Sequence, residues 1–360
     1  YIRVLLPSPT RLSFNYFRSD LTSHSTVCNC VAEQILFSSF RSVCDKYFMN
    51  IETDIMKPLV AGVGLFSFTL LFITACGSHT APSTRFEVAV NGINQGTLSD
   101  GAKYAVIGSV RHGGSLWRLS DNERLYNWNH TQDNNSVLVA NDFDPTTRWA
   151  LTTETRSIVL WDVNSGGAAR FWTAPAEILD AKLATGARFA LLGQSNHSAV
   201  IFNTLSGGIM HSFGHQGRVR SVDLSDDGSI AITGSEDKTS IIWSVNSGQK
   251  ILTITHSEDV QHVSLSPSGR FALSAAKYDR ADIWDVRAKK VLKSIPLSRE
   301  RIKRGLEIVT SKFSPDGQRI LLGYSNQIVE LRDTKSANLI NSWKLTKRKT
   351  WQPASVTALD

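Results

Sequence analysis

Cysteine is scarce and confined to one end of the sequence. The 360 residues contain four cysteines, at Cys28, Cys30, Cys44 and Cys76. A disulfide framework or a zinc site built from cysteine pairs is therefore excluded for everything after position 76, which suits an oxidising compartment. Cys28 and Cys30 are spaced like a metal-binding pair, but no His or Cys cluster accompanies them, so we predict no metal site.

The sequence also lacks the short motifs of common enzyme classes. It contains no H-E-x-x-H zinc motif, no G-x-S-x-G nucleophile elbow and no phosphate-binding Walker loop. The formal net charge of +7 is a mild excess that does not by itself indicate nucleic-acid binding. We therefore predict no catalytic residue, no cofactor and no nucleic-acid partner. The hydrophobic content of 41% is that of an ordinary globular protein.

One long uncharged apolar run covers residues 58–75, directly after Met56 and Lys57. A positive start followed by such a run is typical of a signal peptide. The run ends in Ile73-Thr74-Ala75-Cys76, which resembles the lipobox of bacterial lipoproteins. The resemblance implies cleavage before Cys76 and acylation of its thiol. Gly77 stands where that family carries Asp for inner-membrane retention, which favours the outer membrane.

Two other interpretations of this segment are open. The apolar run could be an uncleaved transmembrane anchor, or translation could begin at Met49, although Glu52 and Asp54 would then make the start of the signal acidic. We expect residues 1–55 to be disordered upstream read-through, 56–75 the signal peptide, 76–83 a linker and 84–360 the folded domain.

A segment that repeats six times begins after residue 84. In each copy, a turn of the Ser-Pro-Asp-Gly type precedes a short apolar run. Pro fixes φ and Gly allows positive φ, so this pattern predicts a tight turn between two strands. The six turn segments are Leu98–Gly101, Phe143–Thr146, Leu183–Gly186, Leu224–Gly228, Leu265–Gly269 and Phe313–Gly317.

Each apolar run leads to a closing position, usually a Trp followed by a polar residue. Successive closing positions are 44, 41, 41, 41 and 48 residues apart. They are Trp117, Trp161, Phe202, Trp243, Trp284 and Arg332. This period and the Trp-Asp endings resemble the WD-repeat family. The resemblance implies an all-β fold, a WD-repeat β-propeller whose four-stranded blades cover one another's faces.

In WD-repeat proteins a His, a Ser or Thr, an Asp and a Trp form a hydrogen-bonded chain inside each blade. The matching residues of the fourth repeat are His215, Thr233, Asp237 and Trp243. A buried His and Asp could also serve catalysis, but buried polar groups need partners, so we interpret this set as structural.

The other repeats depart from that pattern. The fifth keeps His256, Ser274 and Trp284, but Asp279 lies one residue off register. The third has Asn196 in place of the Asp and a Phe in place of the Trp, and the sixth has no closing aromatic. We expect packing to hold these blades more than the polar chain does.

The two ends of the repeat region suggest how the ring closes. Residues 85–90 read as a strand, and in the WD-repeat family such a strand becomes the outer strand of the last blade. Six full repeats follow, and residues 355–360 are similar to the inner strand of a seventh. We predict a seven-bladed ring whose seventh blade is truncated in this chain, with a six-bladed ring as the alternative.

Propellers bind partners mainly through the loops at the ends of the ring. In WD-repeat geometry the connections between blades share one face. Two adjacent connections are rich in Lys and Arg, which predicts a basic patch that attracts phosphate or carboxylate groups. The alternative is that these are solvated loop charges. The candidate partner-binding residues are Arg299, Arg301, Lys303, Arg304, Lys344, Lys347, Arg348, Lys349 and Trp351.

These observations predict a non-catalytic protein-interaction scaffold of the bacterial cell envelope, lipid-anchored to the outer membrane, facing the periplasm and monomeric alone. Its expected partner is an envelope protein, with an anionic lipid or glycan as further candidates. Two alternatives are a structural subunit of an envelope assembly machine and a propeller enzyme with its site at the central channel. Asp237 and Asp279 could contribute to such a channel site.

Overall fold

The structure is a computed structural model that describes part of the chain. No helix in the described part is long and apolar enough to cross a membrane. The predicted signal peptide and Cys76 lie outside the described residues. The described ranges, which all belong to one unit containing residues 79–360, are 87–89, 92–131, 136–297, 305–345 and 356–360.

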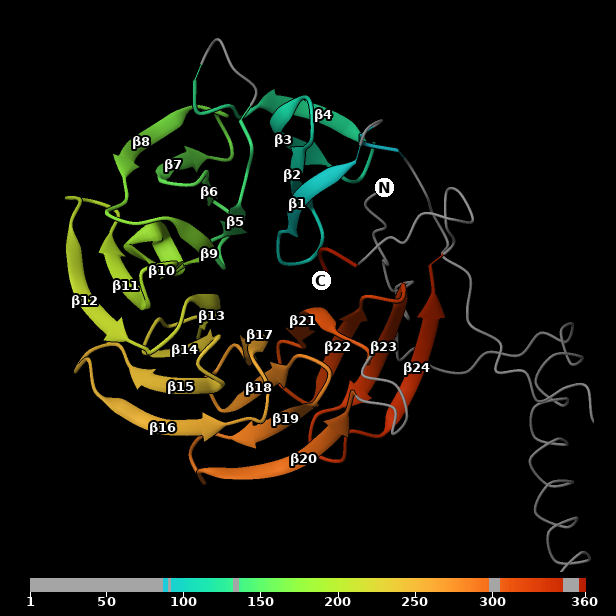
Figure 1. Ribbon diagram of the computed structural model, residues 1–360. Coiled ribbons are helices and arrows are strands. Elements are labelled where there is room, and N and C mark those ends of the chain that lie inside the picture. The colour runs from blue at the N-terminus through green and yellow to red at the C-terminus, as the bar shows by residue number, and fades with distance from the viewer. Residues whose placement is uncertain (1–86, 90–91, 132–135, 298–304, 346–355) are drawn as a thin grey trace, which may run out of the picture. The chain divides into compact units, whose positions relative to one another are not determined.

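Six four-stranded antiparallel sheets in these ranges form the blades of a β-propeller (Figure 1). The first three blades are β1 Ile93–Leu98, β2 Tyr104–Ser109, β3 Gly113–Arg118 and β4 Glu123–Asn127; β5 Ala140–Phe143, β6 Trp149–Thr153, β7 Ser157–Asp162 and β8 Ala168–Thr173; β9 Ile178–Leu183, β10 Phe189–Gln194, β11 Ser198–Asn203 and β12 Ile209–Gly214. The last three are β13 Val219–Leu224, β14 Ile230–Ser235, β15 Thr239–Ser244 and β16 Lys250–Thr255; β17 Val260–Leu265, β18 Phe271–Ala276, β19 Arg280–Asp285 and β20 Lys290–Pro296; β21 Ile308–Phe313, β22 Arg319–Tyr324, β23 Ile328–Asp333 and β24 Leu339–Lys344.

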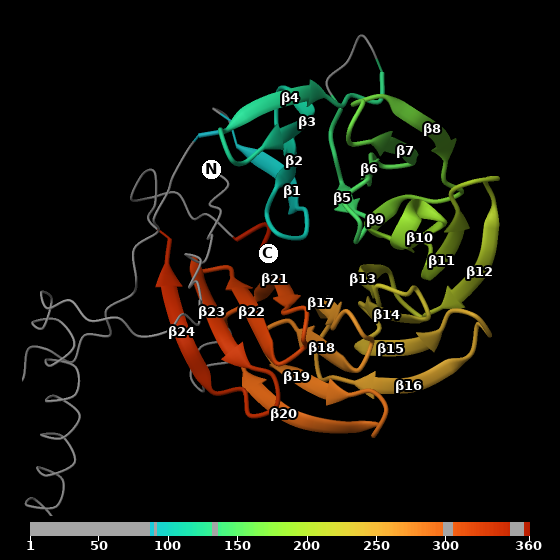
Figure 2. The same cartoon turned by 180° about the vertical axis from the view of Figure 1, so that it is seen from behind.

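Within each blade the strands follow chain order from the centre of the ring to its rim. The innermost strands, such as β13 and β17, surround the centre, and the outermost strands, such as β16 and β20, form the rim (Figures 1 and 2). The predicted all-β propeller with six complete blades is therefore confirmed. One short 3-10 turn, Thr185–Ala187, joins β9 to β10.

The repeated turns join the first strand of a blade to the second, as predicted. In the fourth blade Gly228 has a φ of 69°. Its N–H donates to the Ser225 carbonyl at 2.8 Å. Gly269 and Gly317 repeat both features in the next two blades, each with a φ of 68°. A side chain at these positions would be strained, which explains why Gly recurs there.

The hydrophobic core lies between blades rather than inside any one of them. Middle strands such as β14 and β15 are mostly buried, whereas half of the residues of the outer strand β16 are exposed. One cluster joins Leu191 of the third blade to Val222 and Trp243 of the fourth. Each blade can therefore bury its two apolar faces only against its neighbours.

Residues 356–360 meet the ring between its sixth and first blades. Val356 packs on Gly323, where a Cβ would lie 2.8 Å from the Val356 Cγ1 atom. Gly234 faces the following blade in the same way, because a Cβ there would lie 2.7 Å from the Val260 Cγ1 atom. Val356 thus occupies the place of an inner strand of a next blade, and Ala358 packs against the core of the first blade.

The strand expected at residues 85–90 is not present at 87–89, and residues 356–360 are not in a strand either. A strand needs a hydrogen-bonded neighbour, and no described strand pairs with these segments. The rest of the expected N-terminal strand lies outside the described residues. The seventh blade stays a prediction.

The turn between the third and fourth strands packs on the blade before it. Gly166 has a φ of 70°, and a Cβ there would lie 2.4 Å from the Tyr126 ring of β4. In the next two blades, a Cβ on Gly207 would lie 3.1 Å from the Trp172 ring, and a Cβ on Gly248 would lie 3.1 Å from the His211 ring. A glycine in a left-handed conformation therefore lets an aromatic or imidazole ring lock adjacent blades together.

We predict that Gly166→Ala lowers the free energy of unfolding by about 2 kcal/mol, because the added methyl group is strained by positive φ and overlaps the Tyr126 ring. The neighbouring Gly167→Ala is the matched control. A Cβ on Gly167 would meet only the Ser165 hydroxyl, at 3.5 Å, so stability should stay within about 0.5 kcal/mol. Urea denaturation measures both variants, and equal losses would contradict the proposed lock.

Candidate functional site

A hydrogen-bonded chain crosses the fourth blade from its entrance to its third strand. His215 Nδ1 lies 3.0 Å from Asp237 Oδ2, and His215 Nε2 lies 2.7 Å from the Thr233 hydroxyl. The Trp243 indole N–H donates to the same hydroxyl at 2.9 Å. The structure thus brings all four residues of the predicted chain together. His215, Thr233 and Trp243 are buried and Asp237 is nearly so, and their hydrogen bonds connect the strands of the blade in its interior.

The electrostatics of this chain suit a structural role. Burial lowers the pKa of His215, and the Asp237 carboxylate opposes this only in part, so the imidazole is neutral at neutral pH. Burial alone would raise the pKa of Asp237, but hydrogen bonds from Thr239 and the Gln216 N–H outweigh it and lower that pKa. Both groups are therefore committed to internal partners and neither is a free base.

A second chain of the same kind, in the second blade, was missed by sequence reasoning. His130 Nε2 lies 2.8 Å from the Thr152 hydroxyl, and the Trp161 indole N–H donates to that hydroxyl at 2.8 Å. The other ring nitrogen of His130 contacts Ser157, which in turn bonds Glu154. The carboxylate comes from Glu154, in a turn one residue shorter than that of the fourth blade, so the pattern was hidden. The order of a His, a Thr and a closing Trp was the available signal.

The fifth blade shows what the off-register Asp279 does. Tyr278 takes a left-handed conformation with a φ of 53°, and Asp279 follows it. The Asp279 carboxylate lies 3.5 Å from Arg280 Nη1. His256 Nε2 meets Ser274 at 2.6 Å. The other His256 nitrogen and the Trp284 N–H are buried without a partner. The fifth chain is therefore incomplete.

The sixth blade has an ionic cluster in place of the chain, beside the packing that we expected to hold it, since Ile320 and Leu322 lie in a core shared with the fifth blade. Arg332 stands at the closing position, and its Nε lies 2.8 Å from Glu330 Oε2. The Tyr324 hydroxyl donates to the same carboxylate at 2.8 Å. Arg332 also donates to the Ala337 carbonyl at 2.7 Å, so it joins the third strand to the following turn. In the third blade, Asn196 accepts from Ser198 at 2.8 Å.

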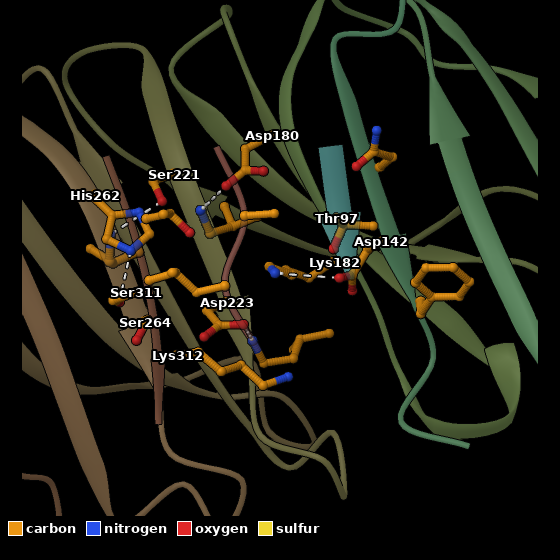
Figure 3. A pocket seen from close by; sticks show the side chains of 18 of the residues that line it. Thr97, Asp142, Asp180, Lys182, Ser221, Asp223, His262, Ser264, Ser311 and Lys312 are labelled. Carbon is orange, nitrogen blue, oxygen red and sulfur yellow. Dashed lines mark hydrogen bonds and ion pairs between the residues drawn. The ribbon is translucent and has the colours of Figure 1, made fainter. Parts of the chain in front are cut away.

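The centre of the ring is a polar channel of about 280 Å³ (Figure 3). Three inner strands each contribute an inward-facing carboxylate, at Asp142, Asp180 and Asp223. Each carboxylate accepts a backbone N–H from the following blade, which ties neighbouring inner strands together. The donors are Leu183, Val222 and Leu265, at 2.9, 2.9 and 2.7 Å respectively. Sequence reasoning missed these residues. For Asp142 and Asp223, a carboxylate directly before the last Phe or Leu of the inner strand was a visible signal, but Asp180 lies three residues before the last Leu of its strand.

Charges in the channel compensate one another. Lys182 Nζ lies 3.4 Å from Asp142 Oδ1. Burial would lower the pKa of Lys182, but Asp142, Asp223 and Asp180 together outweigh it and raise that pKa, so the lysine stays charged. Burial raises the pKa of Asp180 to about 6. His262 lies 2.9 Å from the Ser311 hydroxyl, and burial lowers its pKa to about 3.

This channel holds the blades together rather than presenting free reactive groups. Asp237 and Asp279, considered above for a channel site, lie in turns and do not line the channel. No group of three or more potential metal-ligating side chains occurs in the described part of the chain.

The connections between blades begin on one face of the ring. In the second to sixth blades, the residue after the outer strand donates its N–H to the turn between the second and third strands of the same blade. His215, His256, Leu297 and Leu345 all make this bond at 2.9 Å. The two long basic connections start directly after Leu297 and Leu345, so both leave the ring at this face, which we call the loop face.

The first long connection is closed at its base. The Leu306 N–H donates to the Leu297 carbonyl at 2.8 Å. Gly305 lies against the Tyr278 turn, where a Cβ would be 3.1 Å from Tyr278 Cα. Tyr278 is 38% exposed beside this base. Lys277 lies 3.7 Å from Glu307, so the base also carries an ion pair.

Most of the predicted partner-binding residues lie outside the described residues. They are Arg299, Arg301, Lys303, Arg304, Lys347, Arg348, Lys349 and Trp351. Lys344 is described, and it is the exposed last residue of β24. The structure thus describes the residues at which both connections start, and Lys344 is the one described side chain of the nine.

Comparison with known sequences identifies one of the repeats. Residues 207–244 match the family described as WD domain, G-beta repeat. The propeller is similar to WD-repeat proteins. The matched segment contains β12 to β15 and the whole His215–Trp243 chain. No curated protein sequence matches this chain. WD-repeat propellers generally bind protein partners and are typically not catalytic, which suits an interaction scaffold.

The channel histidine makes stability depend on pH. The pKa of His262 falls from 6.5 to about 3 on folding. The folded state therefore disfavours protonation, and stability is lost as pH falls from 6.5 towards 3. We predict that His262→Gln, which keeps polar atoms for Ser311, reduces the loss of unfolding free energy between about pH 7 and about pH 4.5 by roughly 2 kcal/mol.

Denaturation at the two pH values measures this effect. The raised pKa of Asp180 acts in the opposite direction, between about 6 and 3.8, but it does so in both proteins and cancels in the comparison. The exposed His112→Gln serves as the control and should keep the parental pH dependence. An unchanged dependence in His262→Gln would show that His262 does not limit acid stability.

Proposed function

We propose that this chain is a non-catalytic protein-interaction scaffold of a bacterial cell envelope that binds its partner through the loop face. The observation that carries this proposal is that both long connections start from equivalent positions, after Leu297 and Leu345, on one face of the ring. The Lys and Arg residues of these connections would then act together on phosphate or carboxylate groups of a partner.

The hydrogen bonds that the buried polar groups make within the protein support a non-catalytic role. The channel carboxylates accept backbone N–H groups of neighbouring blades, and His215 is bonded to both Thr233 and Asp237. A general acid or base needs a proton-transfer atom that can reach substrate. These groups instead use their polar atoms to hold strands together.

The anchoring part of the proposal rests on the sequence. The apolar run at residues 58–75 and the Ile73–Cys76 segment support acylation of Cys76, and Gly77 supports the outer membrane. The lipid would hold the propeller at the membrane facing the periplasm, where an envelope protein, an anionic lipid or a glycan is available.

We predict that Cys76→Ser abolishes incorporation of a clickable fatty acid and leaves the apolar segment uncleaved, because the thiol is the only acyl acceptor in the lipobox. Gel mobility and fatty-acid labelling of the expressed protein measure both effects. Ser78→Ala, two residues after the lipobox cysteine, is the matched control and should be labelled normally. Labelling that survives in Cys76→Ser would refute the lipid anchor.

We predict that removing the loop cations abolishes capture of the partner. The tagged protein is crosslinked in intact envelopes and its partners are identified, in parallel with a variant in which six loop cations are changed to Ser. One envelope protein should be enriched with the parent and lost with the variant. The six positions are Arg301, Lys303, Arg304, Lys347, Arg348 and Lys349.

The control variant removes the same number of exposed cations away from the loop face and should capture the partner normally. Equal capture by the parent and the loop variant would place the binding surface elsewhere. Loss of capture in both variants would indicate a general effect of net charge. The control positions are Lys103, Arg124, Arg170, Arg188, Arg319 and Lys335.

A further inference from the structure

The rim of the fifth blade carries an unusual concentration of positive charge. Arg287, Lys289, Lys290 and Lys293 all lie between the end of β19 and the middle of β20, and all four are exposed. In the described residues none of them takes part in an ion pair, and the segment 286–296 contains no acidic residue. The corresponding segments of the other five blades hold at most two Lys or Arg residues each. We call these four cations and Val291 the rim patch.

One of these lysines occupies a position where a side chain is costly. Lys289 has a φ of 51°. At the equivalent turn position the second, third and fourth blades have Gly166, Gly207 and Gly248, with φ between 68° and 77°. A left-handed conformation is unfavourable for an L-residue and free of strain for glycine. The fold would accept glycine here, so the lysine is not required by the turn.

Apolar side chains lie among and beside these cations. Val291 is 41% exposed between Lys290 and Lys293. Its equivalent on the next blade, Leu339, is 52% exposed, and the adjacent Ile340 is 50% exposed. β20 and β24 are the rim strands of neighbouring blades (Figures 1 and 2). Cations interleaved with exposed apolar side chains match the interface of an anionic bilayer, which offers charge and shallow apolar contact together.

The place of the patch in the fold adds to this argument. Each outer strand begins at the turn that follows the third strand and ends at the loop face. The rim patch lies at the beginning of β20, so it is at the opposite end of that strand from the loop face. A surface bound at the rim patch would leave the loop face free for a partner.

We propose that the rim patch docks the propeller on a membrane leaflet that contains anionic phospholipid. The interaction is between the four cations and lipid phosphates, with Val291 at the level of the headgroups. Each Lys or Arg close to an anionic leaflet contributes about fivefold to membrane affinity, and the effect falls with added salt. The proposal does not depend on what binds the loop face.

The test measures amide hydrogen exchange of the full chain reconstituted on vesicles. One set of vesicles is phosphatidylcholine with phosphatidylglycerol, and the other is phosphatidylcholine alone. Exchange in the segment 287–296 should slow severalfold on the anionic vesicles only, and high salt should remove the difference. This readout detects contact at the rim whether or not the N-terminal segment also holds the chain to the vesicle.

A variant with Arg287→Ser, Lys289→Gly, Lys290→Ser and Lys293→Ser should lose the protection. Glycine at position 289 suits the turn, so thermal unfolding should show an intact fold. The matched control changes Lys103, Arg124, Arg170 and Arg188 to Ser, removes the same charge from the first three blades and should keep the protection.

Equal exchange on both lipids, or protection that survives in the rim variant, would overturn the proposal. Protection of 287–296 by polyglutamate but not by anionic vesicles would also overturn it, because the patch would then fit an acidic protein. Loss of loop-face capture in the envelope experiment leaves this readout unaffected, so the two proposals fail separately.

Discussion

The propeller depends on the fact that a blade has two apolar faces and only its neighbours can cover them. Ile232 of β14 is fully buried in a core shared with the fifth blade, and Leu191 of β10 in one shared with the fourth. The inner strands add a polar component, because Asp142, Asp180 and Asp223 each bond the backbone of the next blade. Stability is therefore a property of adjacent pairs of blades.

This constraint leaves little of the interior free for function. Lys182 compensates the carboxylates of the channel, and the His215 chain ties the fourth blade internally. What is left for recognition is the surface that blade packing does not use, namely the two faces of the ring and its rim. The WD-repeat match over residues 207–244 agrees with a fold that serves interaction.

Sequence reasoning predicted what is local and missed what depends on neighbouring blades. The turn at Gly228 and the chain from His215 to Trp243 depend on residues inside one repeat, so their spacing was enough. The chain at His130 was hidden because its carboxylate comes from Glu154, in a turn one residue shorter than that of the fourth blade. The role of Asp223 could not be predicted, since its partner Leu265 lies one blade further on and the pairing exists only when the ring is assembled.

The most direct test of the account is amide hydrogen exchange of the propeller with and without its captured envelope partner. The account predicts slower exchange at the two long connections and at the turns beside them, including residues 277–280, with no change at the turns between third and fourth strands. Protection confined to those latter turns, or to the rim strands alone, would contradict binding through the loop face.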